Sequence, residues 1–147
     1  MSDDPTMDPI VIVGMARTPM GGFQGDLQAA TASELGATAI RAALDRAGIS
    51  GEDVDEVVMG NILSAGQGQA PARQASIGGG IPDSVGCTTI NKMCGSGMKA
   101  AMFAHDMISA GTNDIMVAGG MESMSNAPYL LDRARPLDKV AVAPGIG

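Results

Sequence analysis

Short apolar runs and longer stretches with helical spacing alternate along this chain. Residues 10–13 are four consecutive apolar residues that end at Gly14, and such a run predicts a buried central strand. Further apolar runs predict strands over residues 54–59, 85–91 and 115–118. The chain therefore carries four predicted strands, each followed by glycine, asparagine or loop residues.

Helical patterns fill the spaces between these strands. Residues 31–47 are the clearest case, because Thr31 and Glu34 can form a capping box and apolar residues recur every three or four positions. Gly48 is a typical helix end. Shorter helices are predicted over residues 71–77 and 95–110. Alternating strands and helices predict an α/β fold with a mostly parallel sheet and helices on both faces.

The amino-acid composition limits which classes of partner the chain can bind and which residues can form its core. The 147 residues suffice for one modest domain, and a net charge of −7 argues against nucleic acid or an anionic membrane as the main partner. There is no Trp, one Tyr and two Phe, although 45% of residues are hydrophobic. The core must therefore consist mainly of aliphatic residues and methionine.

The two cysteines, Cys87 and Cys94, are too few for a disulfide framework, and no metal site is expected. Residues 1–9 are acidic and contain prolines, which indicates a loose tail and not a transit peptide. No secretory signal and no apolar run near eighteen residues are found, so a reducing cytoplasm is the expected location.

The stretch 90–97, Ile-Asn-Lys-Met-Cys-Gly-Ser-Gly, carries the candidate chemistry. It places Cys94 between a predicted strand and a predicted helix, where unpaired helix N–H groups favour the thiolate over the thiol. Gly95 and Gly97 let a substrate carbonyl approach the backbone, and the same N–H groups can donate to an oxyanion. The alternative is that Cys94 is a small buried residue in a tight turn.

Three other residues carry groups that could take part in catalysis. His105, the only histidine, lies about 16 Å along the helix from Cys94 at 1.5 Å per residue, and its spacing predicts the packed face. Cys87 lies inside a strand pattern, which favours packing. Glu122 follows a predicted strand end, where catalytic groups gather, although a structural hydrogen-bonding role is favoured over proton transfer.

Two long motifs resemble those of a known family. Residues 91–100 look like the active-site signature of the thiolases, the acyl-CoA C-acyltransferases, and residues 119–125 resemble a second thiolase signature at the expected distance. Residues 17–19 and 60–61 also fit. The match covers about residues 10–131. The Asn-Lys-x-Cys-Gly-Ser-Gly spacing argues against a ketoacyl synthase of the same fold.

The resemblance implies an incomplete N-terminal half of the thiolase fold. Residues 10–121 would form part of the N-terminal domain, and residues 122–147 would begin a loop region that contributes to coenzyme A binding. The family's half has five strands, and the fifth lies between the first and the fourth but comes later in the chain than residue 147. A sheet without an interior strand leaves unpaired edges, so the chain is expected to be an incomplete and inactive fragment.

The resemblance also implies a reaction. Cys94 would take an acyl group from acyl-CoA as a thioester, and a second acyl-CoA would attack it in a Claisen condensation. With acetyl-CoA as the substrate, this is the reaction of an acetyl-CoA C-acetyltransferase. The reverse is thiolysis of 3-ketoacyl-CoA. Coenzyme A thioesters would be substrates, with no permanent cofactor, and the acid–base residues would lie outside this chain. The complete enzyme would be a homodimer or homotetramer. The alternative is a non-catalytic interaction or assembly segment of the same fold.

Overall fold

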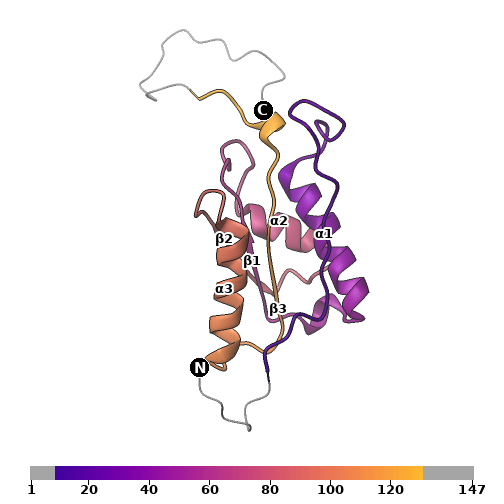
Figure 1. Cartoon of the computed structure of the whole chain (residues 1–147), viewed down its shortest axis with the longest axis vertical. Helices are drawn as coiled ribbons and strands as arrows, with labels where there is room; N and C mark the ends of the chain where they lie inside the picture. Colours follow the sequence, from indigo (N-terminus) through magenta and orange to yellow (C-terminus); the bar gives the residue numbers. More distant parts are fainter. Residues whose placement is uncertain (1–8, 131–147) are drawn as a thin grey trace.

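The computed structural model describes residues 9–130 (Figure 1). The predicted tail therefore lies outside the described residues except for Pro9, and so does the predicted loop region from residue 131 onward. Strands and helices alternate along the described chain, with two short 3-10 helices at Gly51–Asp53 and Met124–Asn126.

Three parallel strands form the sheet: β1 (Glu56–Gly60), β2 (Gly86–Ile90) and β3 (Met116–Gly120). Their order is β2-β1-β3, so β1 is the central strand. In register, Gly60 lies opposite Ile90 on one side and Gly120 on the other. Because the strands are parallel, the segments that follow all three emerge at the same edge of the sheet. This is the edge at which the candidate chemistry was predicted.

Helix α1 (Ala32–Ala47) forms where the sequence predicts it. Thr31 accepts a hydrogen bond from the Glu34 backbone, and the Glu34 carboxylate accepts from the Thr31 backbone at 2.8 Å, so the capping box is complete. These hydrogen bonds from Thr31 lower the pKa of Glu34 below its usual value. Gly48 ends the helix with a φ of 69°, in the left-handed region that glycine adopts without strain.

The other two helices, α2 (Pro71–Gly78) and α3 (Ser96–Ser109), also agree with the pattern. Pro71 occupies the first turn of α2, where its missing N–H costs nothing. All predicted helices and the three observed strands begin and end within two residues of their expected bounds.

Helices cover both faces of the sheet, as predicted (Figure 1). Val57 and Met59 belong to one buried cluster with residues of α1 and α2, including Ile40 and Ala75. Val58 alternates to the opposite face, against which α3 packs. The strand that carries these side chains is thus buried on both sides, which explains its continuous apolar run.

The prediction of a central strand over residues 10–13 is wrong. This segment forms no strand, and its side chains are exposed, Ile12 to 86%. A strand exists only where a second backbone edge satisfies its N–H and C=O groups, and no such edge of the described residues reaches this segment. An apolar run indicates that its side chains are stabilised by burial, but it does not show which part of the protein buries them.

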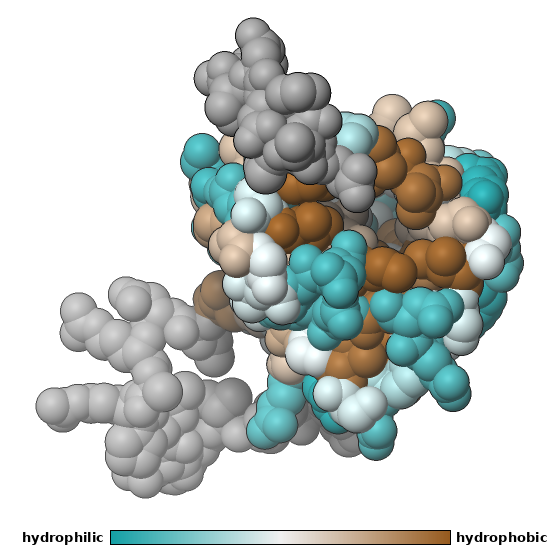
Figure 2. Space-filling view, turned by 90° about the horizontal axis from the view of Figure 1, so that it is seen from below, coloured by the Kyte–Doolittle hydropathy of each residue, from teal (hydrophilic) through white to brown (hydrophobic). Residues whose placement is uncertain are grey.

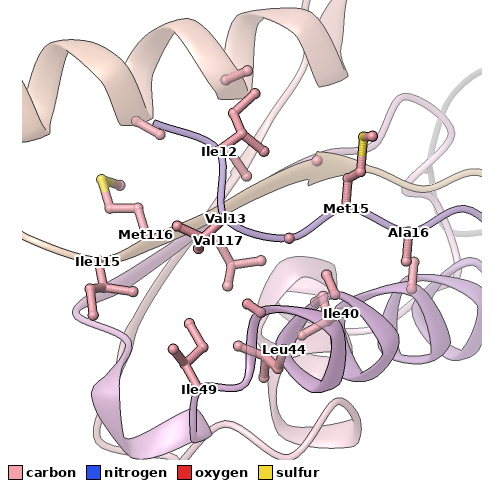
Figure 3. Close-up of a pocket in the computed structure, with 18 of the residues that line it drawn as sticks. Ile12, Val13, Met15, Ala16, Ile40, Leu44, Ile49, Ile115, Met116 and Val117 are labelled. Carbon is pink, nitrogen blue, oxygen red and sulfur yellow. The ribbon is translucent and has the colours of Figure 1, made fainter. Parts of the chain in front are cut away.

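A slot separates this segment from β3 (Figure 3). Its volume is about 520 Å³, and apolar residues of the segment, of α1, of α3 and of β3 line it, among them Val13, Leu44 and Val117. Seen from below, hydrophobic side chains gather around a hollow in the surface (Figure 2). Within residues 9–130, no helix is both long enough and apolar enough to cross a membrane.

Candidate active site

Cys94 lies in the turn that joins the end of β2 to the start of α3. Its residue is exposed and its thiol is free. The residue before it, Met93, has a φ of 49°, which is the left-handed conformation that a side chain such as methionine rarely adopts. Such strain persists only where the surroundings enforce it, and it is frequent at functional sites.

Ser96 supplies much of that enforcement. Its hydroxyl donates to the Met93 carbonyl at 2.6 Å and accepts from the Lys92 backbone N–H at 2.8 Å. The Gly95 N–H donates to the Lys92 carbonyl at 3.1 Å. Ser96 is only 5% exposed, so this hydroxyl spans the turn from inside. The sequence motif contains Ser96 but does not reveal this role, because a hydroxyl that closes a turn four residues back leaves no periodic signal.

The first turn of α3 presents backbone N–H groups toward this turn. Its N-cap is Gly95, which has no side chain that could cap the helix. Within the described residues, the N–H groups of Gly97 and Met98 have no hydrogen-bond acceptor. A helix of 14 residues adds the positive end of its dipole at the same point. This environment can stabilise negative charge that develops on a substrate oxygen bound there.

Glycines allow α3 to begin this close to the sheet. A methyl group at Gly60 would lie 2.5 Å from the Ser96 Cβ, and one at Gly120 would lie 3.3 Å from the Gly97 Cα. Both glycines end strands, β1 and β3 respectively. The absent side chains therefore fix the depth at which the helix start, and with it Cys94, sits above the sheet.

The Cys94 turn borders an open cleft of about 440 Å³. The cleft is also lined by Arg17, Thr18, Met121 and Glu122. Residues of both thiolase-like motifs, 91–100 and 119–125, therefore meet there with the loop that contains Arg17. The slot beside β3 is larger, but apolar groups line most of it and Cys94 does not. A nucleophile and polar neighbours define a reaction site better than volume does, and we therefore assign the candidate site to the smaller cleft.

Glu122 acts here as a hydrogen-bond acceptor. One of its oxygens accepts from the Asn61 side chain and from the Leu63 N–H, both at 3.0 Å, and the other accepts from the Ile62 N–H at 2.9 Å. The Asn61 side chain is buried and donates in addition to the Met121 carbonyl at 3.2 Å. The carboxylate thus ties the segment after β3 to the segment after β1.

His105 and Cys87 lie away from the cleft. The prediction that His105 faces the packed side of its helix is wrong, because its side chain is 64% exposed and contacts the Asp106 carboxylate at 3.4 Å. Small residues, Ala100 and Ala104, form the packed face of α3 instead. Cys87 is half-buried against the core, and its thiol lies 3.4 Å from the Val85 carbonyl oxygen. In the described part of the chain, no three His, Cys, Asp or Glu residues are grouped to hold a metal ion.

Comparison with known proteins finds similar sequences. Residues 10–142 match the family described as thiolase, N-terminal domain. The chain is 61% identical over 126 residues to acetyl-CoA acetyltransferase 2 of Arabidopsis thaliana, covering 86% of this chain and 31% of that protein. It is 54% identical over 129 residues to the mitochondrial acetyl-CoA acetyltransferase of Homo sapiens, covering 88% and 30% respectively.

A solved structure is similar as well. The crystal structure of the Acat5 thiolase from Ascaris suum in complex with coenzyme A superimposes with a TM-score of 0.82 at 41% sequence identity, covering 88% of this chain and 34% of that one. The chain thus spans about a third of the length of the relatives that it matches. The expected cytoplasmic location is wrong by this comparison, because the relatives from mouse, cattle and human are named mitochondrial.

Proposed function

Because the chain belongs to the thiolase family through its N-terminal domain, we propose that it provides the nucleophile of an acyl-CoA C-acyltransferase, with Cys94 in that role. One observation carries the proposal. The thiol is exposed on a cleft directly before the open N–H groups of α3, in a turn held in a strained conformation. A packing cysteine has no need of such a position.

The first half of the reaction uses groups within the described residues. The Cys94 thiolate attacks the carbonyl carbon of an acyl-CoA, a new carbon–sulfur bond forms, and the bond to the coenzyme A sulfur breaks. Coenzyme A leaves as a thiolate, and the acyl group stays on Cys94 as a thioester. The Gly97 and Met98 N–H groups are available to stabilise charge that develops on the carbonyl oxygen.

The second half needs a base that the described residues do not offer beside Cys94. His105 is the only histidine of the sequence and lies on α3, away from the cleft, and the Glu122 carboxylate already accepts three hydrogen bonds. Carbon–carbon bond formation requires removal of an α-proton from a second acyl-CoA. We therefore propose that the chain by itself performs the acyl transfer to Cys94 and not the condensation or thiolysis.

Acetyl-CoA is the proposed acyl donor, because the relatives from plant and animals are named acetyl-CoA acetyltransferases. The Ascaris suum thiolase structure contains coenzyme A, which supports a coenzyme A thioester as the substrate. The cleft is lined by Arg17 and Thr18 in addition to Cys94, so a polar group of the substrate has partners within reach of the thiol.

A homo-oligomer, dimeric or tetrameric, is proposed for the complete enzyme. β2 is an edge strand of the sheet, with one row of backbone N–H and C=O groups unpaired within the described residues. On the outer face of α3, Met98, Met102 and Phe103 are exposed to 68%, 49% and 37%. An open strand edge and an apolar helix face are the features by which subunits associate.

The test is acetylation of Cys94. The chain is incubated with acetyl-CoA, its intact mass is measured, and the modified residue is located by peptide mapping. We expect one added acetyl group on Cys94 and one equivalent of free coenzyme A. The adduct should disappear with hydroxylamine, which cleaves thioesters but leaves acetylated lysine intact. Cys87→Ala should acetylate normally and Cys94→Ala should not.

The same experiment separates the rival function. A chain that shows the helical and strand content of a folded α/β protein by circular dichroism, yet takes no acetyl group on Cys94, contradicts the proposal. That result favours a non-catalytic interaction or assembly segment of thiolase fold. Acetylation of Cys87 and Cys94 at equal rates would also contradict it, because it would mean that the turn and α3 confer no special reactivity.

A further inference from the structure

Glu122 lies in the wall of the Cys94 cleft, but its hydrogen bonds within the described residues do not include the cysteine. Its three hydrogen-bond donors all belong to residues 61–63, the segment that leaves the central strand β1. Two of these donors are backbone N–H groups, which a carboxylate fixes in direction as well as in distance. Glu122 therefore sets the path of the chain after β1.

That segment in turn contacts the nucleophile turn. The Asn91 side chain donates to the Ile62 carbonyl at 3.4 Å, and its oxygen accepts from the Met93 N–H at 3.0 Å. Met93 is the residue with the left-handed conformation directly before Cys94. A continuous series of hydrogen bonds thus runs from the Glu122 carboxylate, through Ile62 and Asn91, to the backbone that orients the thiol.

From this geometry we propose that Glu122 is a positioning residue for Cys94. Its carboxyl oxygens fix residues 61–63, these hold the Asn91 amide, and Asn91 maintains the turn in which the thiol faces the cleft beside the α3 N–H groups. The inference rests on the proposed function, since it is the reactivity of Cys94 that the series of contacts serves. It assigns no proton transfer to Glu122.

This role requires that both carboxyl oxygens of Glu122 accept hydrogen bonds. A carboxylate only accepts hydrogen bonds, and here each of its oxygens faces at least one N–H donor. In Glu122→Gln, one of the two positions becomes an NH₂ group that meets an N–H donor, so at least one hydrogen bond is replaced by a repulsive contact. The side chain keeps its size, and therefore the substitution tests hydrogen bonding and not packing.

Alkylation with iodoacetamide measures the effect, because Cys94 and Cys87 compete within one molecule. The rate ratio of Cys94 to Cys87 is followed by peptide mass spectrometry across neutral pH, and thermal unfolding of each variant is recorded in parallel. We expect Glu122→Gln to lower the ratio by roughly two- to fivefold, because a thiol turned away from the α3 N–H groups loses their stabilisation of the thiolate. Asn91→Asp, which keeps the acceptor for Met93 but loses the donor to Ile62, should lower it in the same direction.

Glu56→Gln is the matched control. It removes the same charge, and Glu56 accepts hydrogen bonds from the Thr88 and Asn113 side chains at the opposite end of β1. Its Cys94 to Cys87 ratio should stay that of the wild type. The proposal is overturned if Glu122→Gln lowers the unfolding midpoint but leaves the ratio unchanged, or if Glu56→Gln changes the ratio equally.

Two further experimental outcomes have distinct meanings. If Glu122→Gln does not fold, Asn91→Asp decides, and an unchanged ratio in that variant overturns the proposal. If the wild-type chain takes no acetyl group from acetyl-CoA, the proposed function fails. The alkylation ratio still reports whether Glu122 and Asn91 control the Cys94 turn, because iodoacetamide needs no coenzyme A site.

Discussion

Adding one methyl group at Gly60 tests whether the start of α3 is fixed by its contact with the central strand. In Gly60→Ala the new carbon would lie 2.5 Å from the Ser96 Cβ, 2.8 Å from the Ser96 carbonyl carbon and 3.0 Å from the Gly97 nitrogen. Carbon atoms settle at about 3.5–4.0 Å, so the first turn of α3 must retreat by about 1 Å. Two of the three neighbours are backbone atoms, which cannot rotate away.

The cost follows from overpacking. Inserting a methyl group into a filled interior destabilises a protein by about 1–3 kcal/mol. For a chain of this length each kcal/mol lowers the unfolding midpoint by about 3 °C, so we expect a drop of about 3–9 °C. The same retreat carries Ser96 away from Met93 and Lys92, and iodoacetamide should then alkylate Cys94 more slowly relative to Cys87.

Gly22→Ala provides the control for this measurement. No atom lies within 4 Å of a Cβ built at Gly22, and its φ is outside the left-handed region. That substitution should leave the midpoint unchanged or raise it slightly, because alanine restricts the unfolded chain. If Gly60→Ala unfolds at the same temperature as Gly22→Ala, and Cys94 keeps its reactivity, the contact between β1 and α3 does not position the nucleophile.

Two further substitutions test the electrostatics and the core. Hydrogen bonds from the Ile115 and Asp114 backbone lower the pKa of Asp55 below 3.8, so its carboxylate stabilises the fold above that pH and this stabilisation is lost as the pH falls through the lowered value. Asp55→Asn should therefore reduce the loss in the free energy of unfolding between neutral pH and pH ~3, measured by urea unfolding. An unchanged pH dependence would contradict the role given to Asp55. Val57→Ala should lower the free energy of unfolding by about 2 kcal/mol in the same assay, because Val57 is fully buried. Val11→Ala, at a position that is 64% exposed, should change it very little. Equal losses in the two variants would contradict the observed core.

Local signals predicted most of the fold. Thr31 and Glu34 predict the start of α1, Gly48 predicts its end, and Pro71 predicts the start of α2. Each of these residues acts on backbone groups within a few residues of itself. The position of Cys94 between β2 and α3 was predictable for the same reason. Its chemistry depends on a turn and a helix start that adjacent residues encode.

Signals that depend on distant partners predicted less. Spacing placed His105 on the packed face of α3, but Ala100 and Ala104 lie there, while Met98 and Met102 point outward. Large apolar residues indicate burial somewhere, whereas the face against a sheet is chosen by how closely small residues let the helix approach. The contacts of Glu122 were equally invisible, since their three donors lie about sixty residues earlier in the chain.

The exposed apolar slot and the turn that holds Cys94 depend on different parts of the chain. Val11, Ile12 and Val13 are 63–86% exposed, and burying each fully would gain about 1.5–3 kcal/mol. They line a slot whose other wall is β3, an edge of the described sheet. A strand inserted there would pair with β3 and cover both walls, which supports the fifth strand implied by the thiolase resemblance. The site around Cys94 lies at the end of the sheet and draws on Ser96, Gly60 and Glu122, none of which lines the slot. The reactivity of the nucleophile can therefore be tested on this chain, even though the apolar residues 11–13 that line the slot are exposed within the described residues.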